Sequence, residues 1–341
     1  MNIIVLCGGL STERDVSLLS GKEAAGALRR LGHNAVLVDM FYGYKGSYNK
    51  PEDVFSAEYT EDSVSINEDA PDLDAVKNSR GGKSRLGDNV LELCRAADIV
   101  FLALHGSDGE DGKIQAMLDL YGVKYTGTGS LGSNLAMNKG VAKQLFRQNG
   151  IMTPEGITVN RNDKTYKNVG FPCVVKPRSG GSSIGTSVVN TQEEYLPALE
   201  AAFKYEDNVI VEQYIKGREC DVGVIRGKAL PVIEICPKSG FFDYKNKYQS
   251  GMTDEYCPAD IPEETAKNLQ NAALAVFDAL MLEVYGRMDF IVDDGGKIWC
   301  LEANTLPGLT PASLMPKEAA AAGIAYDDFC AMIIEDSLKK Y

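Results

Sequence analysis

Apolar runs and amphipathic repeats alternate along the first forty residues of the chain. Residues 2–9 (NIIVLCGG) are apolar throughout and end in two glycines, which predicts a buried parallel strand. Residues 15–32 repeat apolar positions at helical spacing and end at Gly32, and residues 34–39 are apolar again. A strand, a helix and a strand in this order predict an open, doubly wound α/β sheet.

The pattern is interrupted between residues 41 and 90. This segment is polar, weakly periodic and rich in Gly, Asn and Asp, and we interpret it as a long surface insertion. Regular patterns then resume and predict a strand at 98–106 and an amphipathic helix at 111–122.

A second unit begins near residue 131, with a helix predicted over 131–150. Helices are also predicted near 192–203 and at 260–281, and short strands at 155–159, 171–177, 184–189, 208–213, 219–226 and 228–235. The last segment, 325–340, carries apolar side chains along one helical face, so we expect it to dock on the core.

Composition limits the classes of function. The 341 residues, 44% of them hydrophobic and 24% charged, predict a soluble globular protein of two or three domains. A net charge of −13 argues against nucleic acid or an anionic membrane as the main partner, although lysines in a cleft can still bind a small anion. Eight scattered cysteines without a CxxC pair and only two histidines argue against disulfides and zinc. We find no secretion signal and no long apolar run, and we expect a cytoplasmic location.

Two β-rich runs near the C-terminus predict a hairpin with a polar face. If Asp294 and Gly295 form the turn, Arg287 lies opposite Glu302 and Asp289 lies opposite Cys300. Side chains alternate along a strand, which gives one polar and one apolar face. The polar face holds Arg287, Asp289, Glu302 and Asn304, and the apolar face holds Met288, Phe290, Leu301 and Ala303. A turn of three residues would shift the register and separate Asp289 from Glu302.

Asp289, Glu302 and Asn304 offer two carboxylates and an amide oxygen on one face. Hard oxygen donors of this kind suit Mg²⁺. The alternative interpretation is a solvated strand face with a salt bridge to Arg287.

Lys176 ends an apolar strand and precedes a loop of small residues. Backbone N–H groups of residues 180–183 can approach a phosphate closely because their side chains are small. The loop is not a Walker A motif, since no Gly-Lys-Ser/Thr follows and the next element is a strand. An ordinary hairpin loop is the alternative.

These motifs together resemble the ATP-grasp ligases, and within them the D-alanine–D-alanine ligase family. The resemblance rests on GGLSTERDVSLLSG (8–21), LHGSDGEDGKIQ (104–115), the lysine segments, VIVEQYIKGRE (209–219), FFDYKNKY (241–248), GRMDF with LEANTLPG, and LTPASLMP (309–316). It implies an N-terminal Rossmann-like domain (1–128) followed by a two-lobed ATP-grasp fold, with subdomains at 129–208 and 209–341.

The resemblance also implies an activity: ATP-dependent joining of two D-alanines, through an acyl phosphate, for peptidoglycan. The implied nucleotide ligands are Lys139 and Lys176 for phosphates, Lys247 for the γ-phosphate, Glu219 for the ribose, and Glu212, Gln213, Tyr214, Ile215 and Phe241 around adenine. Two Mg²⁺ ions, with Mn²⁺ as a substitute, would be bound by Asp289, Glu302 and Asn304. A homodimer is expected by the same resemblance.

The amino acid substrates would lie beside the nucleotide. The resemblance gives the first D-alanine to Glu13, with Ser182, Tyr248 and His105 near it; the oxyanion to Arg287 and the Gly308 backbone; and the second substrate to Ser313 and Leu314. An acyl phosphate must be kept from water, and residues 239–256, with a glycine near each end and several aromatics, are expected to form a lid.

Four of these residues have simpler interpretations. Glu13 is also a favourable first-turn residue of a helix, and His105 also fits the capping of a loop. Lys139 is common on helices, and Tyr248 suits surface packing.

The chain departs from the family pattern at Asn138, where relatives often have Asp, and at Gln213, where they often have Lys. Tyr248 and Leu314 favour D-alanine over D-lactate and D-serine as the second substrate. A non-catalytic nucleotide-binding regulator and a nicotinamide-dependent oxidoreductase are the other hypotheses, but GGLSTE is not GxGxxG.

Overall fold

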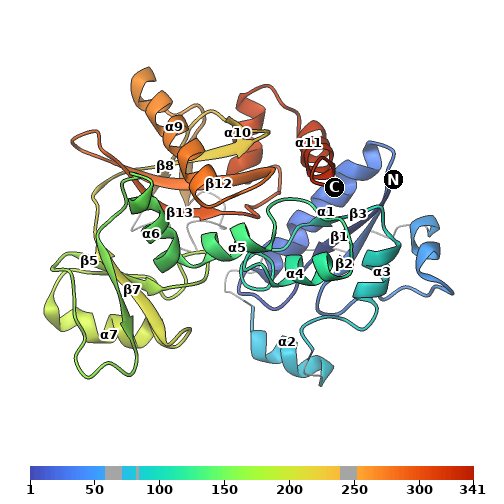
Figure 1. Ribbon diagram of the computed structural model, residues 1–341, viewed down its shortest axis with the longest axis horizontal. Helices are drawn as coiled ribbons and strands as arrows, with labels where there is room; N and C mark the ends of the chain where they lie inside the picture. The colour runs from blue at the N-terminus through green and yellow to red at the C-terminus, as the bar shows by residue number, and fades with distance from the viewer. Residues whose placement is uncertain (58–70, 82–83, 239–251) are drawn as a thin grey trace.

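The structure is a computed structural model that describes residues 1–57, 71–81, 84–238 and 252–341. Its elements form three sheets with helices packed against them (Figure 1). The first sheet is parallel, in the order β2-β1-β3, and is made of β1 (Asn2–Cys7), β2 (Asn34–Asp39) and β3 (Ile99–Leu102). Its helices are α1 (Arg14–Arg30), α3 (Val90–Ala96) and α4 (Lys113–Leu120). The predicted doubly wound α/β domain is confirmed.

The central strand β1 is buried on both faces and ends at the carboxyl edge of the sheet. Residues 3–7 are fully buried and apolar, so both faces of the strand are covered. Gly8 and Gly9 follow at positive φ (71° and 80°), and they turn the chain away from the sheet at its carboxyl edge. Glu13, just before α1, is thereby placed at that edge.

The segment 41–90 is only partly a surface insertion. Helix α2 (Leu73–Arg80) has no buried residue, which agrees with that interpretation. Phe41, Val54 and Phe55 are buried, and the last two lie in the short 3₁₀ helix η1 (Pro51–Ser56). The interpretation is therefore wrong for these three side chains, and Val54 and Phe55 belong to the apolar core of the first domain.

The second sheet is antiparallel and forms a separate lobe with helix α7 (Figure 1). Its order is β4-β7-β5-β6, and the elements are β4 (Gly156–Asn160), β5 (Cys173–Pro177), β6 (Ser187–Val189), β7 (Asn208–Gln213) and α7 (Gln192–Ala202). The boundary expected at 208 thus falls at the start of a strand that pairs within this lobe. The domain boundaries themselves stay predictions.

The single helix predicted over 131–150 is wrong, because the chain forms two helices there. They are α5 (Ser130–Met137) and α6 (Lys139–Gln148), separated at Asn138. Asn138 has ψ 89°, outside the helical range, and its side chain accepts a hydrogen bond from the Val141 backbone N–H at 3.2 Å. The break makes Lys139 the first residue of α6.

The third sheet carries most of the C-terminal half. Its main order is β11-β10-β8-β12-β13, with β9 beside β8. The strands are β8 (Gly217–Ile225), β9 (Lys228–Ala229), β10 (Ile233–Pro237), β11 (Thr253–Tyr256), β12 (Tyr285–Asp293) and β13 (Ile298–Asn304), and α9 (Glu263–Ala279) packs against β8 and β12. The strand predicted over 228–235 is two strands, because Pro231 interrupts the pairing.

The C-terminal helix α11 (Tyr326–Leu338) packs on the N-terminal domain, next to α1 (Figure 1). Its buried residues Phe329, Cys330, Ile333 and Ile334 belong to the same apolar core as β1 and β3. Docking of this helix is confirmed. The two ends of the chain therefore share one core, which fixes the first domain against the third sheet.

Two general features complete the fold. All eight cysteines are free thiols. Among the helices in the described part of the chain, none has the length and hydropathy needed to cross a bilayer.

Candidate active site

The hairpin of β12 and β13 turns over three residues, 294–296, and not over the predicted two. The Asp293 N–H donates to the Lys297 carbonyl at 3.0 Å, and Phe290 lies opposite Cys300. Continued without interruption, this register would separate the two acidic side chains.

A β-bulge at Leu301 restores the arrangement. The register shifts after Asp289, which pairs with Glu302, while Arg287 pairs with Asn304. The four polar side chains therefore lie on one side of the hairpin, as expected, by a route that the sequence pattern does not reveal.

The bulge also corrects two details of the prediction. The pairings of Arg287 with Glu302 and of Asp289 with Cys300 are wrong. Leu301 lines a pocket and does not share the apolar face, whereas Cys300 is buried in the core. One extra residue reverses the faces of its neighbours because side chains alternate along a strand.

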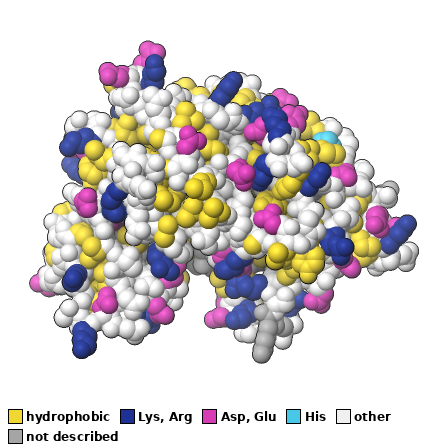
Figure 2. Space-filling model, viewed as in Figure 1, with side chains coloured by type: hydrophobic (Ala, Val, Ile, Leu, Met, Phe, Trp, Pro, Cys, Tyr) yellow, Lys and Arg dark blue, Asp and Glu magenta, His cyan; other side chains and the backbone are white. Residues whose placement is uncertain are grey.

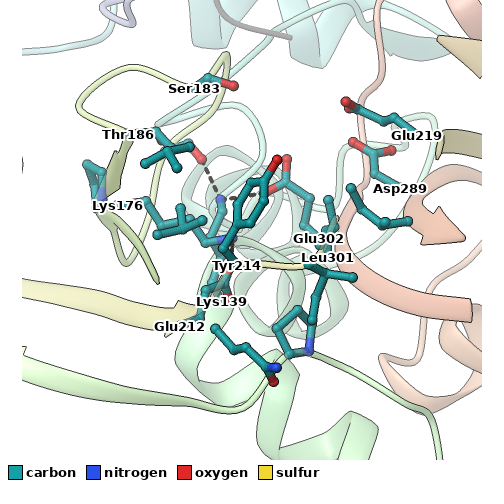
Figure 3. Close-up of a pocket in the computed structure, with 18 of the residues that line it drawn as sticks. Lys139, Lys176, Ser183, Thr186, Glu212, Tyr214, Glu219, Asp289, Leu301 and Glu302 are labelled. Atoms are coloured by element: carbon teal, nitrogen blue, oxygen red, sulfur yellow. Dashed lines mark hydrogen bonds and ion pairs between the residues drawn. The ribbon is translucent and has the colours of Figure 1, made fainter. Parts of the chain in front are cut away.

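The polar side of the hairpin faces the four-stranded sheet across a pocket, which we call the lysine pocket (Figure 3). Asp289 and Glu302 both point into it. Its other lining residues include Lys139, Lys176, Glu212, Gln213, Tyr214, Ile215, Glu219 and Leu301. Every expected nucleotide ligand in the described part of the chain is thus at one pocket.

A buried carboxylate joins two lysines at the base of the lysine pocket. Glu212 lies 2.5 Å from the Nζ of Lys176 and 2.7 Å from the Nζ of Lys143, and all three side chains are buried. Burial disfavours ionisation of Glu212, but the two lysines outweigh it and lower its pKa. Glu212 therefore holds Lys176 in place. Lys143 was not predicted. The sequence signal for it is its position one helical turn after Lys139.

Lys139 connects the hairpin to the loop of small residues 180–183, which we call the glycine loop. Its Nζ lies 3.0 Å from Glu302 Oε2 and donates to the Gly180 carbonyl at 2.7 Å. The lysine is nearly buried, so both contacts form away from bulk water. A cationic group is thus held where the loop and the carboxylate meet.

The glycine loop reaches past the lysine pocket to Glu13. Ser182 and Ser183 adopt positive φ (52° and 57°), which turns the backbone sharply at this point. The Ser182 hydroxyl donates to Glu13 Oε1 at 2.5 Å. A Cβ at Gly181 would lie 2.5 Å from Glu13 Oε2, so a larger residue there would displace the Glu13 carboxylate.

Beyond this contact lies a second pocket, the Glu13 pocket. It is lined by Glu13, His105, Glu110, Ser182, Glu255, Arg287, Asn304, Leu306, Gly308, Ser313 and Leu314, among others. All the predicted substrate residues in the described part of the chain border it. Glu255 and Glu110 were not predicted.

Arg287 forms the wall between the two pockets. Its Nε and Nη2 donate to the two oxygens of Asp289 at 2.8 and 2.9 Å, and Nε lies 3.0 Å from Asp221 Oδ2. Burial opposes the guanidinium charge, but Asp289 and Asp221 outweigh it and raise the pKa of Arg287 above its usual range. The arginine is charged, with one edge occupied by carboxylates.

His105 is buried and bonded through both ring nitrogens. Its Nδ1 lies 2.8 Å from the Leu306 carbonyl, which can only accept, so Nδ1 carries the proton and Nε2 accepts from the Ser20 hydroxyl at 2.8 Å. Burial lowers the pKa of His105, which favours this neutral form. The ring connects α1 to the chain just before Gly308.

Glu110 also binds the Leu306 backbone. Its carboxylate accepts from the backbone N–H of Gly106 at 2.8 Å and of Leu306 at 3.2 Å. Burial and the nearby Glu13 raise the pKa of Glu110 to about 8. An acidic residue inside the Gly-rich run after a buried strand is the sequence signal for it.

Three expected site residues lie outside the described part of the chain. Phe241, Lys247 and Tyr248 belong to residues 239–251, so their roles and the lid stay predictions.

Asp289, Glu302 and Asn304 supply the oxygen atoms of the predicted metal site. In the described ranges, no three His, Cys, Asp or Glu side chains group as a metal site, but Asn304 adds an amide oxygen to the two carboxylates. Its Nδ2 donates to Asp289 Oδ2 at 3.0 Å, which leaves Oδ1 as the donor atom for a cation. Hard oxygen donors that now face Arg287 and Lys139 suit Mg²⁺, which would compete with those cations.

Comparison with known proteins identifies the family. The family model described as D-ala D-ala ligase N-terminus matches residues 2–128, and D-ala D-ala ligase C-terminus matches residues 144–335. The chain belongs to the D-alanine–D-alanine ligase family.

Members of this family resemble the chain over its full length. The D-alanine–D-alanine ligase of Pediococcus pentosaceus is 43% identical over 347 residues, which cover 100% of this chain and 99% of the relative. That of Lacticaseibacillus casei is 44% identical, covering 100% and 97%. The crystal structure of the Bacillus anthracis ligase complexed with ATP has a TM-score of 0.75 at 32% identity and covers 100% of this chain and 98% of that one. The predicted ATP-grasp placement is confirmed.

A buried carboxyl group near Arg287, that of Glu318, has a shifted pKa. Glu318, on α10 (Leu314–Ala321), is fully buried, and its Oε2 accepts from the Gly223 backbone N–H at 2.9 Å. A Cβ at Gly223 would lie 2.4 Å from that oxygen, so a side chain there would displace the Glu318 carboxyl group. Burial raises the pKa of Glu318 to about 8.

We predict that removing the charge of Glu212 destabilises the fold. Glu212→Gln leaves Lys143 and Lys176 buried without their counter-charge, which costs roughly 3–5 kcal/mol. The free energy of unfolding in urea measures this. Asp207→Asn, which breaks an exposed pair with Arg161, is the control and should cost at most about 1 kcal/mol. Equal losses in the two variants would contradict the buried triad.

We predict that Glu318 makes stability fall as pH rises. Its pKa is raised above the ordinary 4.5, so between pH 4.5 and about 8 the unfolded chain releases a proton that the folded chain keeps. Each pH unit in that window then costs up to about 1.4 kcal/mol relative to Glu318→Gln. Urea unfolding of both proteins from pH 5 to pH 8 measures the difference, and the exposed Glu264→Gln is the control. If the free energy of unfolding changed with pH equally in the wild type and in Glu318→Gln, the raised pKa of Glu318 would be refuted.

Proposed function

We propose that this chain is an ATP-dependent ligase that joins two D-alanine molecules into D-alanyl-D-alanine for peptidoglycan, releasing ADP and phosphate. Membership in the D-alanine–D-alanine ligase family supports the reaction, and a related structure complexed with ATP supports the nucleotide. By the same relationship we propose a cytoplasmic homodimer.

One observation carries the proposal: the ion pair of Asp289 and Arg287 joins the two pockets. Asp289 lines the lysine pocket, and Arg287, its bidentate partner, lines the Glu13 pocket. A phosphoryl group bound on one side and a carboxylate bound on the other would therefore be neighbours. Phosphoryl transfer depends mainly on such positioning and on fixed counter-charges.

In the lysine pocket we assign the phosphates to Lys139, Lys176 and the backbone of the glycine loop. Gln213, Tyr214 and Ile215 would border adenine, and Glu219 would contact the ribose. Glu212, whose carboxylate is bonded to two lysines, would act from the pocket floor by fixing Lys176.

We propose that Asp289, Glu302 and Asn304 hold two Mg²⁺ ions, which Mn²⁺ can replace. When bound, these ions neutralise negative charge on the triphosphate. Glu302 would then exchange Lys139 for a cation, which frees the lysine for a phosphate oxygen. Asp289 would likewise divide its oxygens between the cation and Arg287.

In the Glu13 pocket we assign the ammonium of the first D-alanine to Glu13. Ser182 orients this carboxylate through its hydrogen bond. Arg287 and the Gly308 backbone N–H would bind the carbonyl oxygen that becomes negative during attack. Ser313 and Leu314, at the start of α10, would contact the second D-alanine.

The proposed reaction has two steps, phosphoryl transfer and then attack by the second amine. A carboxylate oxygen of the first D-alanine forms a bond to the γ-phosphorus, and ADP leaves. The amine of the second D-alanine then attacks the carbonyl carbon, a C–N bond forms, the amine loses a proton and phosphate leaves. Lys176 and Arg287 stabilise the negative charge that develops in these steps, and no side-chain nucleophile is needed.

The test is phosphate release from MgATP with D-alanine, L-alanine, D-serine or D-lactate supplied separately. We expect release with D-alanine, matched by dipeptide, and none above background with L-alanine. D-serine should react up to about 100-fold more slowly, because an apolar contact such as Leu314 rejects an added hydroxyl only moderately. Phosphate and dipeptide are measured in the same samples.

Two variants control this assay. Lys176→Met should abolish release, whereas Lys228→Met, on the exposed strand β9, should leave it unchanged. ATP binding without turnover of any substrate would refute the ligase and favour a regulator. Faster turnover when D-serine or D-lactate is added to D-alanine would reassign the second substrate.

A further inference from the structure

Asp221 contacts Arg287 but lines neither the lysine pocket nor the Glu13 pocket. It lies on β8, its exposed fraction is 1%, and its Oδ2 is 3.0 Å from Arg287 Nε. Among the described residues, Arg287 is the only basic partner within ion-pair distance of it. Any effect of Asp221 on the site therefore passes through this arginine.

The strand pairing makes this carboxylate costly. Asp221 is directly opposite Asp289 on the neighbouring strand β12, and like charges in directly opposite positions destabilise a sheet. Burial adds to the cost, since an apolar residue in its place would need no counter-charge. What Asp221 provides in return is a second anchor for Arg287.

The second anchor becomes necessary because Asp289 has two tasks. Without a cation, Asp289 binds both Nε and Nη2 of Arg287. A cation bound at Asp289, as proposed above, would leave only part of that carboxylate for the guanidinium. Asp221 is out of reach of the pockets, so its contact with Nε persists. The remaining nitrogen, Nη1, makes no hydrogen bond to another described residue, and Arg287 borders the Glu13 pocket.

We propose that Asp221 is a positioning residue that keeps Arg287 directed at the reacting carbonyl while Asp289 binds the nucleotide's cation. The inference rests on the proposed function and extends it to a residue outside both pockets. Asp221 touches no substrate; it acts by limiting the rotation of the guanidinium.

The decisive variant is Asp221→Asn, which keeps the shape of the side chain and cannot carry a negative charge. Binding of D-alanyl-D-alanine is measured by calorimetry with ADP, once with Mg²⁺ and once with EDTA. With Mg²⁺ we expect the dissociation constant to rise about tenfold in the variant. With EDTA, Asp289 still holds Arg287, so the rise should be less than about threefold. Equal changes in the two conditions would overturn the inference.

Kinetics give an independent test. Dipeptide formation should fall about tenfold in Asp221→Asn, and the dipeptide formed per ADP released should fall with it, because the second step needs the oriented arginine. The KM for ATP should stay within about twofold. In a double-mutant cycle, Asp221→Asn should add nothing to Arg287→Met. Additive losses, or a coupling ratio that does not change, would contradict a role through Arg287.

A matched control separates position from simple loss of an ion pair. Glu234→Gln removes a carboxylate that binds Arg218 at 2.5 and 2.6 Å in the same sheet, away from both pockets. It should leave binding and coupling unchanged. Melting temperatures of all variants verify folding; if Asp221→Asn does not fold, Asp221→Ser replaces it in both tests.

The outcomes distinguish this inference from the proposed function. A wild-type protein that neither turns over D-alanine nor binds the dipeptide overturns both. A wild-type protein that does both, with a normal Asp221→Asn variant, overturns only the role of Asp221.

Discussion

The ion pair between Arg287 and Asp289 is the constraint on which the rest of the site depends. The largely buried guanidinium and the buried carboxylate need each other, because either one alone would be an uncompensated charge. Their bidentate contact fixes the polar side of the hairpin and makes one wall serve two pockets. The bulge at Leu301 then supplies Glu302 next to Asp289.

The fold brings the remaining charges to that wall from distant segments. Helix α11 shares a core with the first sheet and so fixes Glu13 against the third sheet. His105 and Glu110 bond to the Leu306 backbone, about two hundred residues along the chain, and hold the Gly308 region in place. The space-filling view shows a notch between the lobe bearing α7 and the part bearing α2, with both signs of charge on the visible face (Figure 2). A net charge of −13 therefore does not exclude a local site for anions.

The sequence predicted residue types well and exact neighbours poorly. The polar face of the hairpin was predicted because carboxylates are rare at the end of a buried strand, yet both predicted pairings were wrong, since turn length and bulges leave little trace in residue patterns. The break at Asn138 was missed because the apolar spacing continues through it. Lys143 and Asp221 were missed because a single charged residue in an apolar pattern does not reveal its partner.

By itself, the sequence determined most of the strands and helices and the set of chemically capable residues, because these follow from local periodicity and side-chain chemistry. It also carried, in motif order, the resemblance to one ligase family. Only the tertiary structure decided which charges meet: that Glu212 bridges two lysines, that Lys139 binds Glu302, and that Asp221 supports Arg287. The physical reason is that a buried charge is tolerated only beside an opposite one, and the fold brings those partners together from segments that are far apart in the sequence.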